Sequence, residues 1–277
     1  MEANNPALTV VVLTHNTCQV TLRCLSSYYA GLISASAQII VVDNASADGT
    51  ADAIAAQFPD VELVRSEINV GYSGGNNMGL RRARGHSVIL LNSDVIAPAD
   101  SLINMCQELH RQKNIGLLSP RLLAPDGKPQ SFAFGADPSI GYMLKRGARY
   151  LLRMGSMHDW TVNHPMEVDW VSGACLCVRR EALEQVGLLD ERFFMYFEDN
   201  DCCLRMRQAG WKVIYDPRFE VTHLGGASQP KRRISGDIYY ASMLTFYCKH
   251  YSLPAVIILQ MALQGYKLLL QMRHPEN

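Results

Sequence analysis

The sequence predicts an α/β fold with a mostly parallel central sheet and helices on both faces. Short runs of consecutive apolar residues, of which Leu8–Leu13 is the first, are typical of parallel strands that are buried on both faces. Stretches that fit helices separate these runs. Such alternation is typical of strand–helix–strand units, which build a parallel sheet.

The first half of the chain follows this pattern regularly. We expect strands at Leu8–Leu13, Ile39–Val42, Val61–Val64 and Val88–Leu91, and helices at Cys18–Ala30, Thr50–Gln57 and Gly75–Arg84. In such sheets, ligands bind beyond the carboxyl ends of the strands. The residues that directly follow each strand are therefore the first candidates for a functional site.

The second half is less regular. Segment 132–164 is rich in Gly, Arg and aromatic residues and has weak periodicity, which predicts a loop or a mobile flap over the edge of the sheet. Beyond it we expect strands at Val168–Val178 and Trp211–Tyr215, and helices at Glu181–Val186 and Asp199–Ala209. This organisation predicts an α/β unit over residues 1–228 and a helical region over 229–277.

The segment Leu253–Met272 is apolar, but Gln260, Gln264 and Lys267 interrupt it. Their spacing of four and three residues places them on one helical face, which predicts an amphipathic helix rather than a transmembrane span. Such a helix could lie on a membrane surface, pack on the core or form a homodimer. Basic residues that could accompany it at anionic lipid are Lys145, Arg146, Arg149, Arg153, Lys231, Arg232 and Arg233.

Composition excludes several classes of protein. The 277 residues carry 26 Lys plus Arg and 26 Asp plus Glu, so the balanced charge argues against a nucleic-acid binder. The apolar content is that of a globular protein. The eight cysteines show no C-x-x-C spacing and the first residues do not form a signal peptide, so we expect reduced thiols in a cytoplasmic protein.

Polar residues follow each predicted strand of the first half. Asp43 comes after four apolar residues, and its carboxylate could accept hydrogen bonds from a ring N–H or a ribose hydroxyl. Asp48 and Thr50, by contrast, also fit a turn and a helix N-cap. Further candidates at these strand ends are Thr14, Asn16, Asn44, Ser46, Asn92 and Ser93.

A glycine- and asparagine-rich segment leads into the third predicted helix. Its glycines would let the backbone approach a ligand, and a helix that begins near Gly75 would direct N–H groups at a phosphate. The pattern is neither the Rossmann G-x-G-x-x-G nor a P-loop, so oxidoreductases and P-loop kinases are disfavoured. The candidate residues here are Asn69, Gly71, Gly74, Gly75 and Asn76.

Three acids and one histidine suit catalysis. Asp94 follows an apolar strand and could hold a divalent cation together with diphosphate oxygens. Glu198 and Asp199 follow five bulky apolar residues, and burial would raise the pKa of either acid toward that of a general base. The same two acids also fit the first turn of a helix. His223 ends an apolar stretch and could act as a ligand.

Taken together, these motifs resemble the family 2 inverting glycosyltransferases, over the segment from Leu8 to about Ser228. The resemblance implies the Rossmann-like GT-A fold, a nucleotide-sugar donor and Mg²⁺ or Mn²⁺. It implies that Asp43 contacts the base with Asp48 nearby and that the glycine segment lines the donor pocket. It also implies that Asp94 holds the metal, and that His223 joins the metal or the diphosphate. Asp199 would be the catalytic base, with Glu198 as the alternative. Asn92 stands where many members have the first Asp of the D-x-D motif, which leaves one carboxylate fewer and predicts weaker metal binding.

The Asn-Ser-Asp form of that motif, with the glycine segment, resembles the rhamnosyltransferase-like branch that builds bacterial surface polysaccharides. It implies transfer of one sugar from dTDP-L-rhamnose to a glycan or lipid-linked glycan at the inner face of the cytoplasmic membrane. Gln208-Ala209-Gly210-Trp211 lacks the Arg of the processive Q-x-x-R-W motif. Alternatives are a UDP-hexose or UDP-N-acetylhexosamine transferase, a nucleotidyltransferase and a non-catalytic nucleotide-sugar-binding module.

Overall fold

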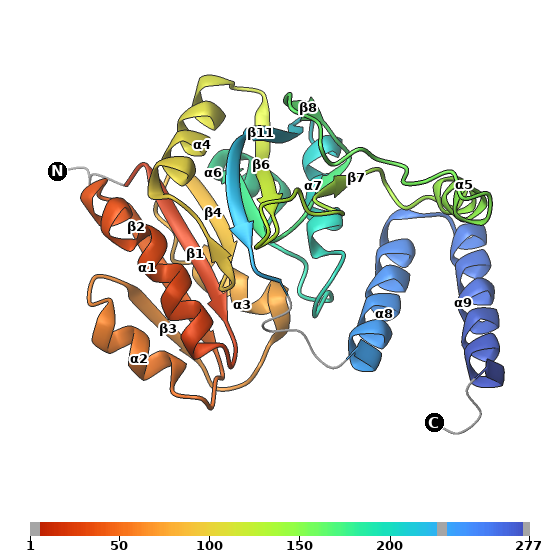
Figure 1. Cartoon of the computed structure of the whole chain (residues 1–277), viewed down its shortest axis with the longest axis horizontal. Coiled ribbons are helices and arrows are strands. Elements are labelled where there is room, and N and C mark those ends of the chain that lie inside the picture. The colour runs from red at the N-terminus through yellow and green to blue at the C-terminus, as the bar shows by residue number, and fades with distance from the viewer. Residues whose placement is uncertain (1–5, 226–231, 274–277) are drawn as a thin grey trace.

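The computed structural model describes residues 6–225 and 232–273, and confirms the predicted α/β class (Figure 1). Its central sheet has the order β3-β2-β1-β4-β10-β6-β11-β5, and β8 pairs with β11. A separate ribbon joins β7 to β9. The strands are β1 (Leu8–Thr14), β2 (Gln38–Asn44), β3 (Glu62–Ser66), β4 (Ser87–Asn92), β5 (Val95–Ile96), β6 (Ile115–Leu123), β7 (Phe134–Gly135), β8 (Met166–Glu167), β9 (Trp170–Val171), β10 (Cys175–Arg179) and β11 (Lys212–His223).

The sheet is mostly parallel. Strands β3, β2, β1 and β4 run parallel to one another, and β6 runs parallel to β11. Strand β10 lies antiparallel between β4 and β6, while β5 and β8 are antiparallel to β11. The carboxyl ends of β1, β2 and β4 therefore meet at one edge, where the polar residues of the sequence gather.

Helices cover both faces of the sheet (Figure 1). Helices α1, α2 and α4 form one layer, and α3, α6 and α7 lie on the other face. Helices α5, α8 and α9 stand beside the sheet. The helices are α1 (Cys18–Ser34), α2 (Thr50–Gln57), α3 (Gly71–Leu80), α4 (Ala99–Arg111), α5 (Ile140–Leu151), α6 (Arg180–Val186), α7 (Glu198–Gln208), α8 (Arg232–His250) and α9 (Leu253–Arg273).

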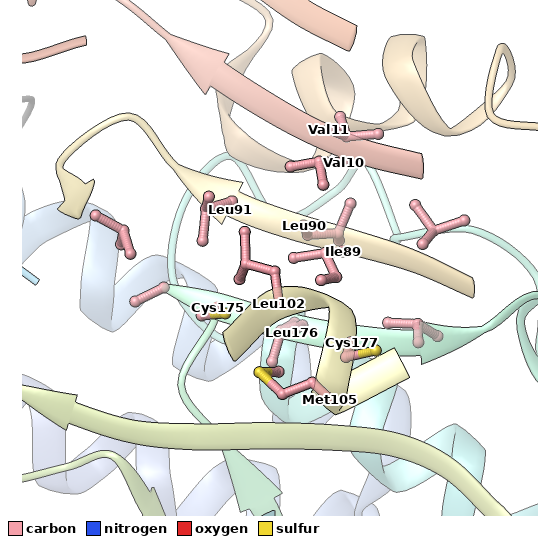
Figure 2. Packing of buried hydrophobic residues seen from close by; sticks show 14 of the residues in the cluster. Val10, Val11, Ile89, Leu90, Leu91, Leu102, Met105, Cys175, Leu176 and Cys177 are labelled. Carbon is pink, nitrogen blue, oxygen red and sulfur yellow. The ribbon is translucent and has the colours of Figure 1, made fainter. Parts of the chain in front are cut away.

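Part of the core lies between the sheet and α4, as Figure 2 shows. Leu102 and Met105 of α4 are fully buried against the apolar run Ile89–Leu91 of β4 and the neighbouring run Cys175–Cys177 of β10. Burying one such aliphatic side chain contributes about 1.5–3 kcal/mol. This apolar body fixes the strands, and the strands in turn fix the edge where the site lies.

Helix α3 differs from its prediction because it begins at Gly71 rather than Gly75. Its glycines pack against the sheet: a Cβ atom on Gly75 would lie 2.3 Å from Leu13 Cδ1, and one on Gly79 would lie 2.4 Å from Val11 Cγ1. The glycine-rich segment is therefore mostly helix, and it brings the helix backbone close to β1.

Three further elements correct the sequence prediction. Segment 132–164 is not only a loop, because it contains α5, whose N-cap Ser139 accepts a hydrogen bond from Tyr142 N. The strand expected at Val168–Val178 is broken into β9 and β10 by the turn at Gly173. The last strand runs beyond Tyr215 to His223. Helix α8 falls within the helical region expected over residues 229–277, whereas strand β6 was not anticipated.

The two C-terminal helices pack against each other and against the chain that precedes α7. Phe193 and Phe197 join Phe246 of α8 and Val256 and Leu259 of α9 in a second apolar cluster. The predicted boundary between residues 228 and 229 lies outside the described residues, as does Lys231. Among the residues that the structure describes, no helix is long and apolar enough to cross a membrane.

Candidate active site

A cavity of about 580 Å³ opens at the carboxyl ends of β1, β2 and β4. The segment before α7 closes its other side. The sequence-predicted residues that the structure brings together on its wall are Thr14, Asn16, Asn44, Asn69, Gly71, Asn92, Ser93, Asp94, Glu198, Asp199 and His223.

Amide side chains build the wall of this cavity by joining its loops. Asn44 Nδ2 donates to Asn69 Oδ1 at 2.9 Å and to the Gly71 carbonyl at 3.2 Å. Asn16 N donates to Ser46 Oγ at 2.9 Å, which joins the loops after β1 and β2. These side chains therefore fix the shape of the cavity through contacts within the protein.

Six predicted residues do not line the cavity: Asp43, Ser46, Asp48, Gly74, Gly75 and Asn76. Asp48 has a structural role, because its carboxylate accepts hydrogen bonds from Cys18 N and from Thr50. Asn76 is buried within α3 and donates to the Tyr72 carbonyl. Gly74 and Gly75 lie within the same helix, so they do not form a ligand loop.

The N-terminus of α3 is not free to receive a phosphate in the way the sequence suggested. Gly71 N donates to Asn69 Oδ1 at 2.9 Å, and Tyr72 N donates to the Phe194 carbonyl at 2.6 Å. The protein itself thus satisfies these first N–H groups.

Asp43 lies at the end of β2, beside Thr14 of β1 in register. It is only 4% exposed, and its Oδ1 atom has no hydrogen-bond partner among the described residues. A buried, unsatisfied acceptor is costly. Because its neighbour Thr14 lines the cavity, a ligand N–H that reaches this end of β2 could satisfy that oxygen.

Asp94 and His223 face each other across the cavity wall, with Asp94 Oδ1 3.3 Å from His223 Nε2. The side-chain oxygen of Gln130 lies 2.9 Å from His223 Nδ1. An oxygen acceptor at this distance favours a proton on Nδ1, which leaves Nε2 as the ring atom that faces the Asp94 carboxylate. Two electron-pair donors at this spacing suit a cation between them.

The described residues contain no group of three or more His, Cys, Asp or Glu side chains that could hold a metal ion. Asp94 and His223 therefore supply two ligands of these types. This donor set fits Mg²⁺ or Mn²⁺ when diphosphate and water oxygens complete the coordination, which is how Mg²⁺ commonly binds in proteins.

Glu198 and Asp199 open α7 directly after two residues in the left-handed region, Tyr196 with φ 70° and Phe197 with φ 67°. Asp199 accepts hydrogen bonds from Gly173 N at 2.9 Å and Asn200 N at 2.8 Å. Glu198 is buried, and its Oε2 atom has no partner among the described residues. Both acids line the cavity.

Glu198 and Asp199 have different environments, which favour different protonation states and therefore different roles. Burial, together with the nearby Asp199 charge, raises the pKa of Glu198 well above its usual range. Burial also raises the pKa of Asp199, although N–H donors from Gly173 and Asn200 oppose that rise. A neutral Glu198 beside an ionised Asp199 is the arrangement that this pair favours, because two adjacent buried charges repel.

A second cavity of about 1040 Å³ lies on the far side of these acids. Both cavities are lined by Ser172, Tyr196, Glu198, Asp199 and His223, which therefore form a shared wall. Beyond this wall the second cavity is rich in aromatic side chains, and its lining includes Phe132, Phe134, Tyr142, His158, Trp160, Trp170 and Tyr239.

Sequence reasoning missed three contributors to the site. Tyr72 donates its hydroxyl to the Gly173 carbonyl at 2.6 Å, and Gly173 N in turn holds Asp199. Tyr72 stands within the glycine-rich segment, so attention to that segment could have found it. Gln130 lies in an irregular stretch that gives no local signal of its contact with His223.

Comparison with known proteins agrees with this arrangement. The profile of the family described as "Glycosyltransferase like family 2" matches residues 6–236, and the chain belongs to this family. A mannosyltransferase from Pyrobaculum calidifontis, solved in complex with GDP-Man and Mn²⁺, superimposes with a TM-score of 0.56 over 99% of this chain and 82% of that one, at 19% identity. The fold is thus that of the GT-A glycosyltransferases.

Two curated relatives are similar to this chain in sequence. The chain is 31% identical over 205 residues to the N-acetylglucosaminyl-diphospho-decaprenol L-rhamnosyltransferase of Mycobacterium tuberculosis, a match that covers 67% of this chain and 66% of the relative. It is 32% identical over 212 residues to a low-salt glycan biosynthesis hexosyltransferase of Haloferax volcanii. This match covers 75% of this chain and 65% of the relative. The chain therefore spans about two thirds of the length of these relatives.

Proposed function

We propose that this protein is an inverting glycosyltransferase that moves one sugar from a nucleoside-diphosphate donor to a hydroxyl of a second substrate. The observation that carries the proposal is the pair of cavities that share Glu198 and Asp199. A donor in the cavity at the strand ends and an acceptor in the aromatic cavity would meet at these acids. This arrangement argues against a non-catalytic binding module, and membership of the family argues against a nucleotidyltransferase.

Asp199 removes the proton from the acceptor hydroxyl in this mechanism. The acceptor oxygen then forms a bond to the anomeric carbon from the side opposite the diphosphate, while the bond from that carbon to the diphosphate oxygen breaks. The nucleoside diphosphate leaves with both bonding electrons, and the configuration at the anomeric carbon is inverted. Gly173 N and Asn200 N hold the carboxylate in place throughout.

Asp94 and His223 would hold Mg²⁺ or Mn²⁺ beside the departing diphosphate, and Gln130 would keep the proton of His223 on Nδ1. When bound, the cation would neutralise negative charge that develops on the leaving group. Asp43 would accept a hydrogen bond from the nucleotide base through its unsatisfied oxygen.

We propose dTDP-L-rhamnose as the donor, on the strength of the Asn92-Ser93-Asp94 motif and the mycobacterial rhamnosyltransferase relative. The hexosyltransferase relative keeps a UDP-hexose or UDP-N-acetylhexosamine as the alternative. The acceptor would be a glycan or lipid-linked glycan of a surface polysaccharide, and α9 would hold the enzyme against the inner face of the cytoplasmic membrane.

A donor screen tests this proposal. The protein is incubated with several nucleotide sugars, acceptor glycans and Mn²⁺, and release of nucleoside diphosphate is measured together with competition by dTDP and UDP. We expect turnover with dTDP-L-rhamnose and tighter binding of dTDP. Asp94→Ala and excess chelator should each abolish turnover. Preference for UDP would favour the alternative donor, and full activity in chelator would contradict the metal assignment.

A further inference from the structure

The aromatic cavity extends from the acids to α5, where two arginines complete its lining. Arg146 and Arg153 both face this cavity, and the Arg146 guanidinium lies 5.6 Å from the centroid of the Phe132 ring. Neither guanidinium forms an ion pair or a hydrogen bond with another side chain of residues 6–225 or 236–266. Two guanidinium groups on a cavity wall without carboxylate partners indicate an anionic ligand, because Arg binds phosphate oxygens in a bidentate manner.

The charge of the surrounding segment also favours an anionic ligand. Residues 140–157 contain four Lys and Arg side chains and no acidic one. Arg149 has a structural use, since it donates to the carbonyls of Met154 and Ser156 beyond the end of α5. Lys145 lies on the same helix but does not line the cavity. Arg146 and Arg153 are thus the two basic residues of α5 and its C-terminal flank that a ligand in the cavity can reach.

Exposed apolar side chains accompany these arginines. Ile140 and Met143, at the start of α5, pack against the cluster formed with α8 and α9. Leu144 and Leu151 continue the same face of the helix, and they remain 69% and 81% exposed. Leu152 and Met154 follow and are also exposed. An exposed apolar face beside cationic residues is typical of a segment that contacts lipid.

We propose that Arg146 and Arg153 form a diphosphate subsite for a lipid-linked acceptor. The inference rests on the proposed transferase function and names the acceptor class. A sugar joined through a diphosphate to a lipid chain matches the aromatic wall, the two arginines and the exposed apolar face of α5, in that order. Its hydroxyl would lie at Asp199, its sugar along the aromatic wall, its phosphates at the two arginines, and its lipid at the exposed face of α5.

Binding can be measured without transfer, because two of the three tryptophans, Trp160 and Trp170, line the cavity. The full-length protein is first saturated with nucleoside diphosphate, so that the donor cavity is filled. Tryptophan fluorescence then follows titration with farnesyl diphosphate, farnesol and inorganic pyrophosphate. We expect farnesyl diphosphate to bind at least about tenfold more tightly than farnesol or pyrophosphate, because only it uses both the charged and the apolar features.

Arg146→Ala and Arg153→Ala should each weaken farnesyl diphosphate binding by roughly 10- to 100-fold, the range for loss of one charged hydrogen-bond partner. Their affinity for farnesol should stay unchanged. Lys145→Ala is the matched control, since it removes the same charge from α5 outside the cavity, and should bind as the wild type does. Circular dichroism and thermal melts show that each variant is folded.

Equal losses in Lys145→Ala and Arg146→Ala would overturn the subsite, because they would indicate general surface charge. Wild-type affinity in both arginine variants would also overturn it. Failure of the transferase function has a different signature: no sugar nucleotide is turned over, while the arginine-dependent binding of farnesyl diphosphate persists.

Discussion

Tyr196 and Phe197 set the direction in which Glu198 and Asp199 point. Both adopt left-handed backbone angles, which cost a non-glycine residue about 1–3 kcal/mol. Contacts on two sides offset this cost. Phe197 packs on Phe246 with ring centroids 5.5 Å apart, and Tyr72 N donates to the Phe194 carbonyl. The position of the acids therefore depends on contacts with α3 and α8.

Gly71→Ala should reduce turnover strongly, because an added Cβ would lie 2.5 Å from the Phe194 carbonyl oxygen and push away the segment that carries the acids. Gly71 also has φ 77°, which adds backbone strain for Ala. Gly210→Ala is the control: its φ is 88°, but no atom lies within 4 Å of the added Cβ. Kinetic assays and thermal melts should show that both variants lose stability and that only Gly71→Ala loses most of its kcat. A similar loss of kcat in Gly210→Ala would contradict this account.

At the scale of secondary structure, charges that are buried or partly buried join the end of α8 to the segment before α7 and to α7 itself. Lys249 Nζ lies 2.7 Å from Asp190 Oδ2 and 2.6 Å from Asp201 Oδ1. Asp201 is fully buried and also contacts His250 and Arg205. This cluster ties the C-terminal pair of helices to the elements that present Glu198 and Asp199.

Lys249→Met should destabilise the protein by roughly 3 kcal/mol at pH 7, because it leaves the buried Asp201 and the partly buried Asp190 with one cation fewer. Lys212→Met removes an exposed partner of Glu167 and should cost less than about 0.5 kcal/mol.

Hydrogen bonds from Arg192 and Lys249 hold the pKa of Asp190 well below its ordinary value of 3.8. A carboxyl group whose pKa is lowered in the folded protein stabilises the fold at pH values above its ordinary pKa. This contribution to the free energy of unfolding is lost as the pH falls below that ordinary pKa. The difference in Tm between wild type and Lys249→Met should therefore narrow below about pH 4; a difference that widens there would contradict the assignment.

Helix α9 has two apolar faces. Val256 and Leu259 are buried against α8, whereas Ile257, Ile258 and Met261 are about half exposed or more and point away at 100° per residue. Burial on one face confirms packing as one use of the helix. The outward face is available for lipid or for a second copy of the chain.

Replacing Ile257, Ile258 and Met261 together by Ser should release the protein from anionic vesicles, since it removes the apolar area that enters the lipid interface. The double variant Gln260→Ser, Gln264→Ser alters neighbouring positions of the same helix and should still bind vesicles. Sedimentation with vesicles measures both. Equal partition of the triple variant and the wild type would rule out this face as a membrane contact, and a change from dimer to monomer in light scattering would assign it to dimerisation.

Across the whole molecule, the sequence was most informative where local pattern and burial agree. The apolar runs of β1, β2 and β4 made these strands predictable, and with them the sheet edge that carries Asp94. The glycines of α3 misled the prediction, because a glycine that admits a ligand and one that admits a neighbouring strand look alike in sequence. Helix α5 was missed because Gly141 and Gly147 weaken its pattern and only part of its apolar face packs on the protein.

The shared wall between the cavities could not be predicted, because it depends on long-range contacts. Gln130 meets His223 across 93 positions of the chain, and Tyr72 reaches Gly173 across 101. No local pattern reports such pairs. The sequence could identify the acids through the apolar run before them, but not which substrate lies on each side.

The central claim is that Asp199 is the base at which the two cavities meet, and Asp199→Asn tests it most directly. We predict that kcat falls by roughly 10²- to 10⁴-fold, because a positioned base is lost, while nucleotide affinity stays near that of the wild type. Glu198→Gln should keep most of the activity, since Gln replaces an acid that the raised pKa keeps neutral. The wild-type kcat should fall as the pH drops through a pKa above the ordinary 3.8 of Asp. Wild-type turnover in Asp199→Asn with loss in Glu198→Gln would reverse the two roles, and full activity in both variants would contradict the account.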